Sequence, residues 1–434
     1  MEKINVFWFR RDLRLNDNVG LKAALTSGLQ VLPIFIFDRH ILDELPENDA
    51  RVTFIFNRLQ NLRDELRDKY ETGIAFYYGK PEEIIKDLTK EYSVNAVFTN
   101  RDYEPYAKQR DEKIKDLLDE QGIDFKIFKD HVVFEKSEVV KGDGDPYLVY
   151  TPYMKKWKKA FESVDVETAN SEDYLDNIYK HQRLPNLTLE DMGFVESEQE
   201  VPDYNLSKSL LDNYGDTRNT PSIEGTSRLS PYLRFGLVGY REVVKKALAS
   251  SDETYLNELI WREFYAMILY HYPESSHKAF KEKYDNIEWR NNEEEFEKWK
   301  NGQTGYPIVD AGMRQLNQTG WMHNRVRMIV GSFLCKHLLI DWRWGEAYFA
   351  EKLLDYEMAS NVGGWQWVAG SGVDAAPYFR VFNPYSQTDK FDKDKKYIKK
   401  YVPELDTDEY PEPMVEHKMA RERCLDTYKA GLNS

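Results

Sequence analysis

The sequence predicts an α/β N-terminal domain with a five-stranded parallel, Rossmann-like sheet, followed by an all-α C-terminal domain, with a long linker joining them. Three observations lead to this prediction. Short apolar runs alternate with amphipathic segments at the start of the chain, an acidic stretch with prolines follows, and almost every later segment has helical periodicity. The predicted bounds are residues 1–130 for the first domain, 131–203 for the linker and 204–434 for the helical domain.

A sheet is predicted for the first domain because its short apolar runs are separated by amphipathic segments. Strands alternating with helices in this way form parallel sheets with right-handed crossovers, which bind ligands at the carboxyl ends of the strands. Strands are expected at residues 4–9, 31–38, 74–79, 96–100 and 125–129, and helices at residues 18–28, 49–70, 81–92 and 104–121. Neither a G-x-G-x-x-G motif nor a P-loop follows the first strand, so a standard dinucleotide or nucleoside triphosphate site is not expected there.

A charged stretch comes directly after the first strand. Residues 7–18, FWFRRDLRLNDN, contain three arginines and two aspartates. The charges either serve a ligand at the strand ends or pair with one another. We interpret the stretch as a salt-bridged loop that fixes the strand to the following helix.

The linker is distinguished by its charge. Residues 161–205 carry twelve acidic residues against two basic ones, Lys180 and Arg183, and two prolines interrupt them. A short amphipathic helix with four lysines is expected just before, over residues 151–161. We interpret the acidic stretch as a linker that wraps the surface largely without regular structure.

The overall charge of the chain is acidic. Lys plus Arg total 60 and Asp plus Glu total 75, a formal charge of −15. This balance argues against a general nucleic-acid coat, whose domains are basic, but it allows a local basic patch. Such a patch would form if Arg218, Arg325 with Arg327, Arg380 and the run 390–400 converge. The alternative is a set of unrelated, solvated sites.

Cysteine content and hydropathy indicate the compartment. Cys335 and Cys424 are the only cysteines, so neither a disulfide framework nor a cysteine-rich zinc site is expected, and a reducing compartment is. The first residues do not resemble a signal peptide, and no apolar run approaches the ~20 residues of a spanning helix. We expect a cytoplasmic protein.

The helical domain is predicted from the periodicity of its apolar positions, and no internal repeat is evident. The abundance of Trp, Arg and Tyr in its helices indicates that they line something as well as fill a core. Helices are expected at residues 205–214, 229–250, 252–271, 293–300, 307–320, 321–340, 343–356 and 393–401.

One motif in this domain is a candidate phosphate-binding segment. Residues 224–236, EGTSRLSPYLRFG, cluster the hydroxyls of Thr226, Ser227 and Ser230 before a helix with Pro231 in its first turn. Backbone amides at a helix N-terminus together with hydroxyls suit a pyrophosphate. The same pattern is equally typical of a capped turn.

A second motif combines a carboxylate with an indole. In residues 257–265, NELIWREFY, the side chains of Glu258, Trp261 and Arg262 fall on one helix face. A planar base could be bound there by hydrogen bonding and stacking. A surface Glu258–Arg262 pair beside a core tryptophan is about as well supported by the local sequence.

A third motif offers an amide. In residues 320–334, GWMHNRVRMIVGSFL, Asn324 and Met328 share a face, and an amide provides the donor and acceptor that a nucleobase edge needs. His323 has no partner in sequence and is interpreted as structural. No H-E-x-x-H, catalytic triad motif or metal-ligand spacing occurs, so neither a metal site nor hydrolysis is expected.

Residues 355–384 combine glycines, an amide and two tryptophans. Asn361 precedes Trp365 by four positions, so a helix would place both on one face, with Trp367 pointing elsewhere. The arrangement suggests a buried ring system with groups on either side. Taken alone, a glycine-rich turn that leads into an aromatic core helix explains the stretch equally well.

Together these motifs resemble the photolyase/cryptochrome family, and within it the class I cyclobutane pyrimidine dimer photolyases. The resemblance covers nearly the whole chain. It is carried by VFWFRRDLRLNDN, EGTSRLSPYLRFG, NELIWREFY, GQTGYPIVDAGMRQLNQTGWMHNRVRM, LLIDWRWGE and GGWQWVAGSGVDAAPYFRVFNP.

The resemblance implies an antenna domain followed by a helical domain that holds FAD in a U shape. The implied activity is that of a light-driven DNA repair lyase, in which excited reduced FAD donates an electron to a flipped-out pyrimidine dimer. The implied partner is UV-damaged DNA, and the protein is expected to be a monomer. A second chromophore, a deazaflavin or methenyltetrahydrofolate, is implied without its identity.

Matching positions imply the residues that bind FAD. The phosphates and ribityl chain would be held by Tyr214, Thr226, Ser227, Arg228, Leu229 and Ser230. The isoalloxazine would be surrounded by Arg262, Arg327, Asp355, Glu357 and Asn361, and would also be near Glu258 and Asn324. Asn361 would face flavin N5 and donate to the anionic ring, which is the electrostatic reason to expect a repair enzyme.

Matching positions also imply contacts with DNA and a route for electrons. Glu258 and Asn324 would hydrogen-bond the dimer, with Glu258 protonated because of burial. The apolar side of the dimer would be walled by Met328, Trp261 and Trp367. DNA phosphates would be bound by Arg218, Arg325 and Arg380. Electrons would pass along Trp365, Trp342 and Trp289, in order from flavin to surface.

Two departures from the family pattern limit the carry-over. Glu357 stands where the family usually has Asp, so its carboxylate is one methylene longer. Residues 103–111, YEPYAKQRD, lack the Asn-Glu pair of folate-binding relatives, which leaves the antenna open.

Two other activities compete with dimer repair. One is a cryptochrome-like photoreceptor that binds FAD without repairing DNA, although a long signalling tail is not expected here. The other is (6-4) repair, which usually needs a histidine pair, whereas here Asn324 follows His323.

Overall fold

A computed structural model describes residues 2–164, 167–181 and 183–434. Its contacts divide the chain into two units that interleave along the sequence. The first unit comprises residues 1–135, 161–202 and 229–246, and the second comprises residues 136–160, 203–228 and 247–434. The linker sequence is therefore shared between the units, and the domain bounds at 130 and 203 stay a prediction.

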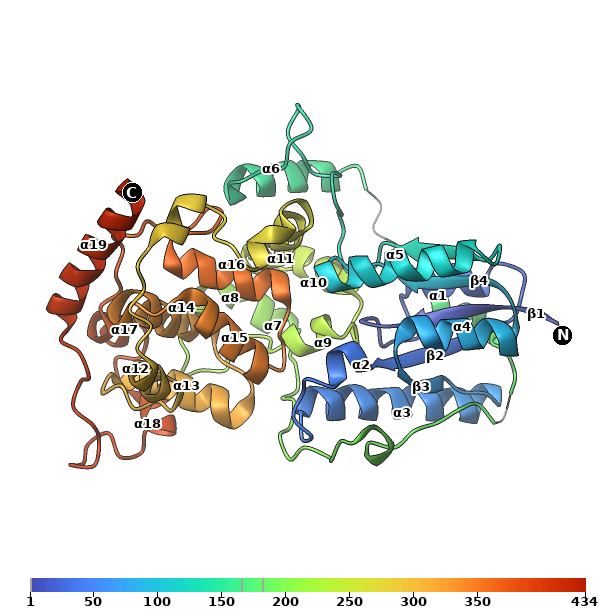
Figure 1. The fold of residues 1–434 in the computed structure, drawn as a ribbon, viewed down its shortest axis with the longest axis horizontal. Coiled ribbons are helices and arrows are strands. Elements are labelled where there is room, and N and C mark those ends of the chain that lie inside the picture. The colour runs from blue at the N-terminus through green and yellow to red at the C-terminus, as the bar shows by residue number, and fades with distance from the viewer. Residues whose placement is uncertain (1, 165–166, 182) are drawn as a thin grey trace. The chain divides into compact units, whose positions relative to one another are not determined.

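The first unit is built on the predicted parallel sheet, which Figure 1 shows with its helices. Its strand order is β3-β2-β1-β4-β5, and all neighbours are parallel. The strands are β1 Lys3–Phe9, β2 Val31–Asp38, β3 Ala75–Gly79, β4 Ser93–Asn100 and β5 Asp124–Phe128. The helices between them are α1 Val19–Leu25, the short α2 Arg39–Leu42, α3 Ala50–Tyr70, α4 Pro81–Glu91 and α5 Pro105–Asp119. The predicted fold class is confirmed.

Alternation along β1 explains why both faces of the sheet are covered. Phe7 and Phe9 pack with apolar residues of α1 and α3, whereas Val6 and Trp8 pack with those of α4 and α5. Side chains of successive strand residues point to opposite faces, so a strand that is apolar throughout must be buried on both.

The arginines of the stretch after β1 form buried ion pairs, but with residues distant in sequence and not with the helix that follows. Arg14 Nη2 lies 2.6 Å from Asp130 Oδ2, and Arg241 Nη2 lies 2.9 Å from Asp130 Oδ1. Arg10 pairs in the same way with Asp111 at 2.5 Å. Burial alone would raise the pKa of Asp130, but the guanidinium groups of Arg14 and Arg241 outweigh it and lower that pKa below its ordinary value.

The lowered pKa of Asp130 predicts a specific loss of stability in acid. A carboxyl whose pKa is lower in the folded than in the unfolded state stabilises the fold above its unfolded value, about 3.9, and this contribution is lost as pH falls through the folded value. Asp130→Asn should therefore flatten the pH dependence of sheet stability below about pH 4. Hydrogen exchange of the strand amides at several pH values measures this, with the exposed Asp116→Asn as control. Equal slopes for the two variants would contradict it.

The acidic stretch of the linker is anchored to the first unit by apolar residues. It contains two 3₁₀ helices, Ser171–Asn177 and Glu190–Met192. Leu175, Met192 and Phe194 are buried in the core cluster that also contains Phe7. Residues 165–166 and 182 of this stretch lie outside the described residues. The expected surface wrap therefore has buried anchors that its charge did not reveal.

The predicted helix at residues 229–250 is two helices, α9 Ser230–Arg234 and α10 Tyr240–Leu248. The break falls at Gly236, which has φ +65° and where a Cβ atom would clash with the carbonyl oxygen of Arg11. Only glycine combines this backbone conformation with so close an approach.

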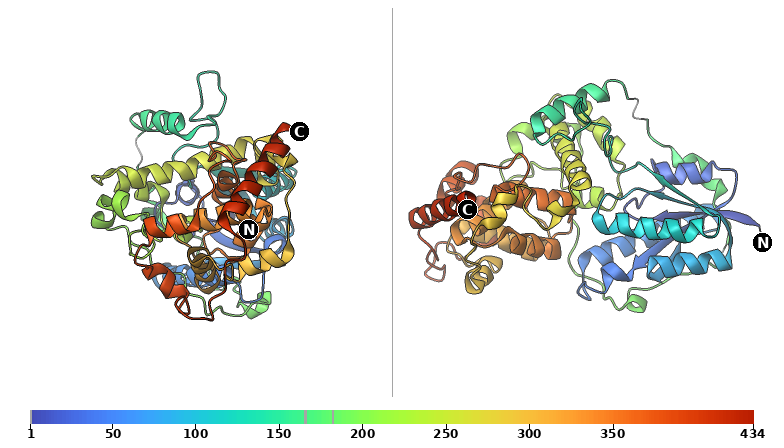
Figure 2. Two further views of the ribbon diagram at one scale, coloured as in Figure 1. Left: turned by 90° about the vertical axis from the view of Figure 1, so that its left-hand side faces the viewer. Right: turned by 45° about the horizontal axis from the view of Figure 1, so that its top comes forward.

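The second unit is helical (Figures 1 and 2). Its helices are α6 Tyr150–Phe161, α7 Lys208–Asp212, α8 Tyr214–Thr217, α11 Thr254–His271, α12 Glu293–Lys300, α13 Pro307–Thr319, α14 Asn324–Ser332, α15 Trp342–Lys352, α16 Met358–Ala369, α17 Pro384–Phe391, α18 Lys396–Tyr401 and α19 His417–Asn433. The predicted helix at residues 321–340 begins only at Asn324 and continues after α14 as a π-helical turn, Phe333–Leu338. The helices α16, α17 and α19 were not among the predicted periodic segments.

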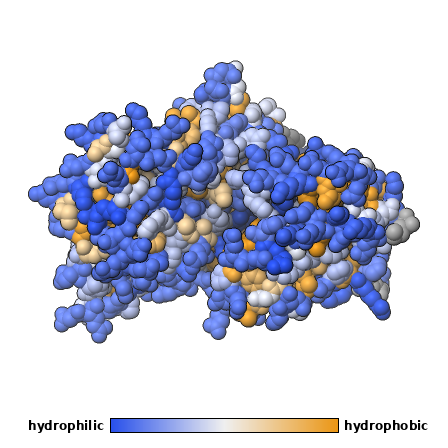
Figure 3. All heavy atoms as spheres, in the orientation of Figure 1, coloured by the Kyte–Doolittle hydropathy of each residue, from blue (hydrophilic) through white to orange (hydrophobic). Residues whose placement is uncertain are grey.

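Surface hydropathy agrees with the composition of the chain. The face drawn in Figure 3 is mostly hydrophilic, with apolar side chains scattered over it. Across the described residues, the structure has no helix that is both long enough and apolar enough to cross a membrane.

Candidate functional site

A cavity in the helical unit brings most of the predicted site residues together. It measures about 1,590 Å³, including space open to solvent, and is formed by α8, α11, α14, α15, α16 and neighbouring segments. The predicted residues that line it are Tyr214, Arg218, Thr226, Glu258, Trp261, Arg262, Asn324, Arg325, Arg327, Met328, Asp355, Glu357, Asn361, Trp365 and Trp367. Residues from segments more than 100 positions apart thus meet around one hollow.

Two arginine–carboxylate pairs stand in the wall of this cavity. Arg262 Nη2 lies 2.9 Å from Glu357 Oε1, and Arg327 Nη2 lies 2.8 Å from Asp355 Oδ2. The Ser360 hydroxyl donates to the other oxygen of Glu357 at 2.9 Å. The longer side chain of Glu357 is therefore accommodated by a direct pair with Arg262, which answers the doubt that the departure from Asp raised.

Glu258 is less buried than expected. Its side chain is 36% exposed and accepts a hydrogen bond from the guanidinium of Arg218. The prediction that burial makes Glu258 a donor is therefore not supported by this geometry, in which Glu258 is an acceptor. Arg218 directly follows α8 and Glu258 belongs to α11, so one ion pair joins two walls of the cavity.

Asn361 also differs from its expected orientation. Its Nδ2 donates to the Glu346 carbonyl oxygen at 3.1 Å and to Glu346 Oε1 at 2.9 Å. The group of Asn361 that remains for a ligand is Oδ1, an acceptor, and not the donor that the sequence analysis assigned. Burial raises the pKa of Glu346 above its ordinary value, despite the hydrogen bond from Asn361.

Trp261 is supported from behind by a ring that the sequence analysis missed. Tyr150, at the start of α6, stacks on Trp261 with ring centroids 3.7 Å apart and an interplanar angle of 8°. The Tyr150 hydroxyl donates to the Asn257 carbonyl oxygen at 2.6 Å, and the Tyr150 amide donates to Asp374 Oδ2 at 3.1 Å. Tyr150 is far from α11 in sequence, so no local pattern indicates this contact.

The predicted tryptophan relay occupies the core beside the cavity. Trp365 is buried. The centroid of its ring lies 4.9 Å from that of Phe349 and 6.1 Å from that of Trp299. Trp342 is buried in the same core cluster, and the half-buried Trp289 packs against that cluster. Trp299 was assigned no role from the sequence. The sequence of its helix α12 indicates only that one apolar face is buried.

The predicted phosphate-binding segment is only partly at the cavity. Tyr214 and Thr226 line it, while the Ser227 hydroxyl accepts from Tyr255 at 2.9 Å. Arg228 instead pairs with Glu224 at 2.6 Å, and Leu229 and Ser230 belong to the first unit.

The three arginines expected to contact DNA lie near one another. Arg218 and Arg325 line the cavity, and Arg325 Nη2 donates to Asn219 Oδ1 at 2.7 Å. Burial, and then the positive charges of Arg218 and Arg380, lower the pKa of Arg325. Like charges gathered in this way create a positive potential that suits an anionic ligand, although Arg218 also pairs with Glu258.

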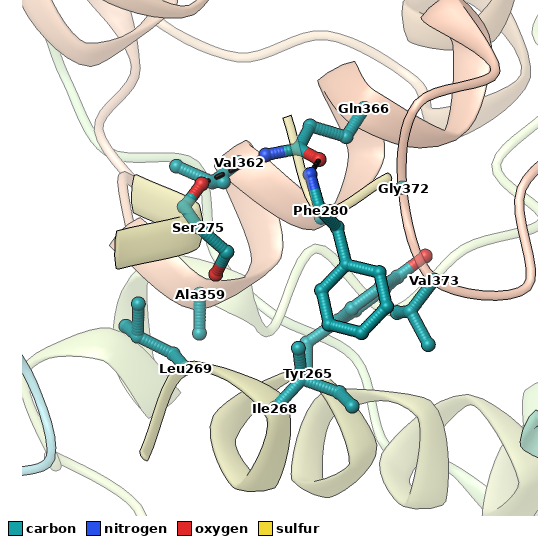
Figure 4. Close-up of a pocket in the computed structure, with 11 residues that line it drawn as sticks. Tyr265, Ile268, Leu269, Ser275, Phe280, Ala359, Val362, Gln366, Gly372 and Val373 are labelled. Carbon is teal, nitrogen blue, oxygen red and sulfur yellow. Dashed lines mark hydrogen bonds between the residues drawn. The ribbon is translucent and has the colours of Figure 1, made fainter. Parts of the chain in front are cut away.

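A second, apolar cavity of about 310 Å³, including space open to solvent, is lined by residues of α11, α16 and neighbouring segments (Figure 4). Tyr265 belongs to the lining of both cavities. Gln366 closes the apolar cavity by accepting from the Phe280 amide at 2.8 Å and donating to the Ser275 carbonyl oxygen at 2.7 Å. This packing fixes the helix that carries Asn361.

Adjacent glycines of α16 provide a matched test of that packing. A Cβ atom at Gly363 would clash with the Tyr265 ring, whereas a Cβ at Gly364 would meet nothing within 4 Å. Gly363→Ala should lower the free energy of unfolding by about 1–3 kcal/mol, as overpacking does. Gly364→Ala should raise it by up to about 1 kcal/mol, because alanine favours helix. Urea unfolding followed by tryptophan fluorescence measures both, and equal effects would contradict the assignment.

The described residues can be compared with the arrangements that bind metal ions. Among them, no group of three or more His, Cys, Asp or Glu side chains is arranged to hold a metal ion.

Comparison with known families gives two matches that together cover much of the chain. Residues 5–172 match the family model described as DNA photolyase, and residues 255–408 match the FAD binding domain of DNA photolyase.

Curated relatives match along nearly their full length. The deoxyribodipyrimidine photo-lyase of Halobacterium salinarum is 36% identical over 97% of this chain and 98% of its own. That of Synechococcus sp. is 38% identical over 92% of this chain and 88% of its own.

Solved structures have the same fold. A class III photolyase from Agrobacterium tumefaciens has a TM-score of 0.87 at 33% identity, covering 100% of this chain and 99% of its own. An archaeal photolyase from Sulfolobus tokodaii, solved with two FAD molecules, has a TM-score of 0.84 at 35% identity, covering 99% and 100%. A cryptochrome from Synechocystis sp. has a TM-score of 0.86 at 26% identity, covering 98% and 99%.

Proposed function

Because the chain belongs to the DNA photolyase family, we propose that it is a light-dependent lyase that splits cyclobutane pyrimidine dimers in DNA. Residues 255–408 are the FAD-binding domain of that family, so FAD is the cofactor. The observation that carries the proposal is one cavity in which aromatic walls, amides and arginine–carboxylate pairs meet. We propose that the enzyme acts as a cytoplasmic monomer.

The cavity fits FAD with a base beside it. At Gly364, a side chain would project into open space in this cavity, so glycine keeps the volume free. When bound, reduced FAD supplies the electron that light drives to the dimer.

Charged pairs would hold the ring of the flavin. Arg262 and Arg327 would offer guanidinium donors, each kept in position by a carboxylate, and Asn361 Oδ1 would accept from a ring N–H. Because its donors are committed to Glu346, the amide of Asn361 cannot rotate without losing two hydrogen bonds. Other residues proposed at the ring are Glu258, Asn324, Asp355 and Glu357. Those proposed at the phosphates and ribityl chain are Tyr214, Thr226, Ser227 and Arg228.

Five residues would bind the dimer. Trp261, Trp367 and Met328 would pack on its apolar surfaces, and their burial would offset the cost of unstacking a base. Asn324, the first residue of α14, would present a donor and an acceptor to the base edges. Glu258 would accept from a ring N–H, and Arg218 would hold its carboxylate in place. These groups orient the dimer and exclude water while the bond breaks.

Positive charge would hold the damaged strand. Arg218, Arg325 and Arg380 would each contact a phosphate, which makes binding weaker as salt is raised. We also propose that Trp365, Trp342 and Trp289 carry electrons between the flavin and the surface, and that the first unit binds a second, antenna chromophore. A relative solved with two FAD molecules supports the second chromophore without identifying it here.

Illumination of the reduced, FAD-loaded protein with a dimer-containing oligonucleotide tests the proposal. Blue light should restore unmodified thymines, and the same mixture in the dark should not. FAD-loaded protein that leaves the dimer intact under light would overturn the proposal.

A photoreceptor without repair activity is the second candidate, supported by the fold shared with a cryptochrome. It differs in its affinity for DNA. A photoreceptor would bind damaged and undamaged oligonucleotides equally, whereas the lesion pocket described here should favour the damaged one. (6-4) repair would instead show as activity on that lesion alone.

A further inference from the structure

Lys336 is a buried amino group in the helical unit. It lies in the π-helical turn Phe333–Leu338 and is only 1% exposed, although lysine is almost never fully buried without a partner of opposite charge. Across the described part of the chain, no carboxylate forms an ion pair with it. Its Nζ donates instead to the backbone carbonyl oxygen of Arg380 at 3.0 Å.

The position of this amino group is costly for the fold. Burial lowers the pKa of Lys336 to about 8, the thiols of Cys424 and Cys335 oppose this shift, and the positive charge of Arg380 adds to it. The side chain is therefore mostly charged at neutral pH. Because an apolar side chain would fill the same space without burying a charge, the hydrogen bond to Arg380 is what the amino group contributes.

The acceptor belongs to the segment that joins α16 to α17, here called the α16–α17 loop. Beside Arg380 in this loop, Tyr378 and Val381 pack against a core cluster that contains Tyr428. The rings of Tyr378 and Tyr428 stack with centroids 5.9 Å apart and an interplanar angle of 10°. Apolar packing thus holds the neighbours of Arg380, while Lys336 holds the backbone of Arg380 itself.

The side chain of Arg380 is available to a ligand. The residue is exposed, no ion pair among the described residues includes it, and its guanidinium carbon lies 5.4 Å from the centroid of the Phe382 ring. Its positive charge is close enough to Arg325, in the cavity wall, to lower the pKa of that residue. Arg380 therefore combines an exposed charge with a carbonyl oxygen that a buried ammonium holds.

We propose that Lys336 is a positioning residue that holds Arg380 ready to contact a DNA phosphate. The hydrogen bond would fix the backbone of the α16–α17 loop before DNA arrives, so that less order has to be gained on binding. Lys336 would not touch DNA, because it is buried. The inference rests on the phosphate contact proposed above for Arg380, and it adds the residue that keeps that contact in place.

Three substitutions separate the hydrogen bond from the charge. Lys336→Met removes the amino group, and it should fold because an unbranched apolar side chain replaces a buried charge. Arg380→Gln removes the phosphate contact and leaves the backbone carbonyl group in the chain. Lys281→Met is the matched control, because the Lys281 amino group also donates to a backbone carbonyl oxygen, that of Gly370 at the start of the same loop, at 3.3 Å.

Titration of FAD-loaded protein with undamaged DNA at several salt concentrations, followed by fluorescence anisotropy, tests the inference. Arg380→Gln should lower the affinity by about tenfold and reduce the slope of log affinity against log salt by about 1, as the loss of one phosphate contact does. Lys336→Met should give most of both changes, and Lys281→Met should give neither. In the Arg380→Gln background, Lys336→Met should add nothing, because its effect passes through Arg380.

Hydrogen exchange distinguishes positioning from a general loss of stability. In Lys336→Met, the amides of residues 377–382 should exchange faster than in wild type, while those of α11 and α14 should keep their protection. Faster exchange throughout the helical unit would instead give Lys336 a structural role and would overturn the inference.

The binding experiment has two further outcomes that would contradict the inference, and they differ. If Arg380→Gln lowers the affinity but Lys336→Met does not, or if Lys336→Met lowers it further in the Arg380→Gln background, then Lys336 does not position Arg380. If Arg380→Gln changes neither affinity nor slope, the proposed phosphate contact is wrong and the inference falls with it. Dimer repair under light, measured separately, shows whether the proposed function still holds.

Discussion

Trp261→Ala is expected to lower the affinity for dimer-containing DNA by roughly 10- to 100-fold, with little change for undamaged DNA. Stacking on an aromatic side chain is worth about 1–3 kcal/mol per base. An alanine would remove that surface and also leave the Tyr150 ring, now 3.7 Å from the indole, facing an empty wall. Fluorescence anisotropy with matched damaged and undamaged oligonucleotides measures the change.

Variants of Tyr150 show whether the wall or its support matters. Tyr150→Phe keeps the stack and loses only the hydrogen bond to Asn257, so its damaged-DNA affinity should stay near that of wild type. Tyr150→Leu removes the supporting ring and should give an intermediate loss. If Trp261→Ala lowers damaged and undamaged affinity equally, Trp261 does not line the lesion pocket.

The sequence pattern predicted the strands, the helices and the helix faces, whose structure depends on residues close together in the chain. The strands and the helices between them were predicted from apolar periodicity. Strands of a parallel sheet are buried on both faces and therefore have nearly continuous apolar sequences. Glu258, Trp261 and Arg262 were placed on one face of α11 by helical spacing, and all three line the cavity. The start of α14 was misplaced by three residues, since His323 caps the helix through its imidazole and not through a usual capping side chain.

Contacts between distant segments were beyond the same reasoning. Tyr150 supports Trp261 from a helix more than 100 residues away, and Glu346 determines which end of the Asn361 amide is left for a ligand. Arg228, which was assigned to phosphates within a motif, pairs in the structure with Glu224. In each case the sequence supplied the chemical group and tertiary packing decided its direction.

The pair of Arg327 with the buried Asp355 yields a large predicted effect on stability. Arg327→Met should lower the free energy of unfolding of the helical unit by about 2–3 kcal/mol, less than for a fully buried ion pair because the Arg327 side chain is 26% exposed. The reason is that the Asp355 side chain is 3% exposed and would stay buried without its guanidinium. Nine of the ten tryptophans lie in this unit, so urea unfolding followed by tryptophan fluorescence reports on it almost alone.

Adding Asp355→Leu to Arg327→Met should recover much of this loss, because the pair is then replaced by apolar side chains and no buried charge remains. The exposed pair of Lys298 and Glu294, in the same unit, is the control, and Lys298→Met should leave stability unchanged within error. FAD affinity distinguishes a role of the pair in cofactor binding from a role in stability. The double variant should fold but bind FAD weakly, since both residues line the cavity, whereas a double variant that binds FAD like wild type would limit the pair to a structural role.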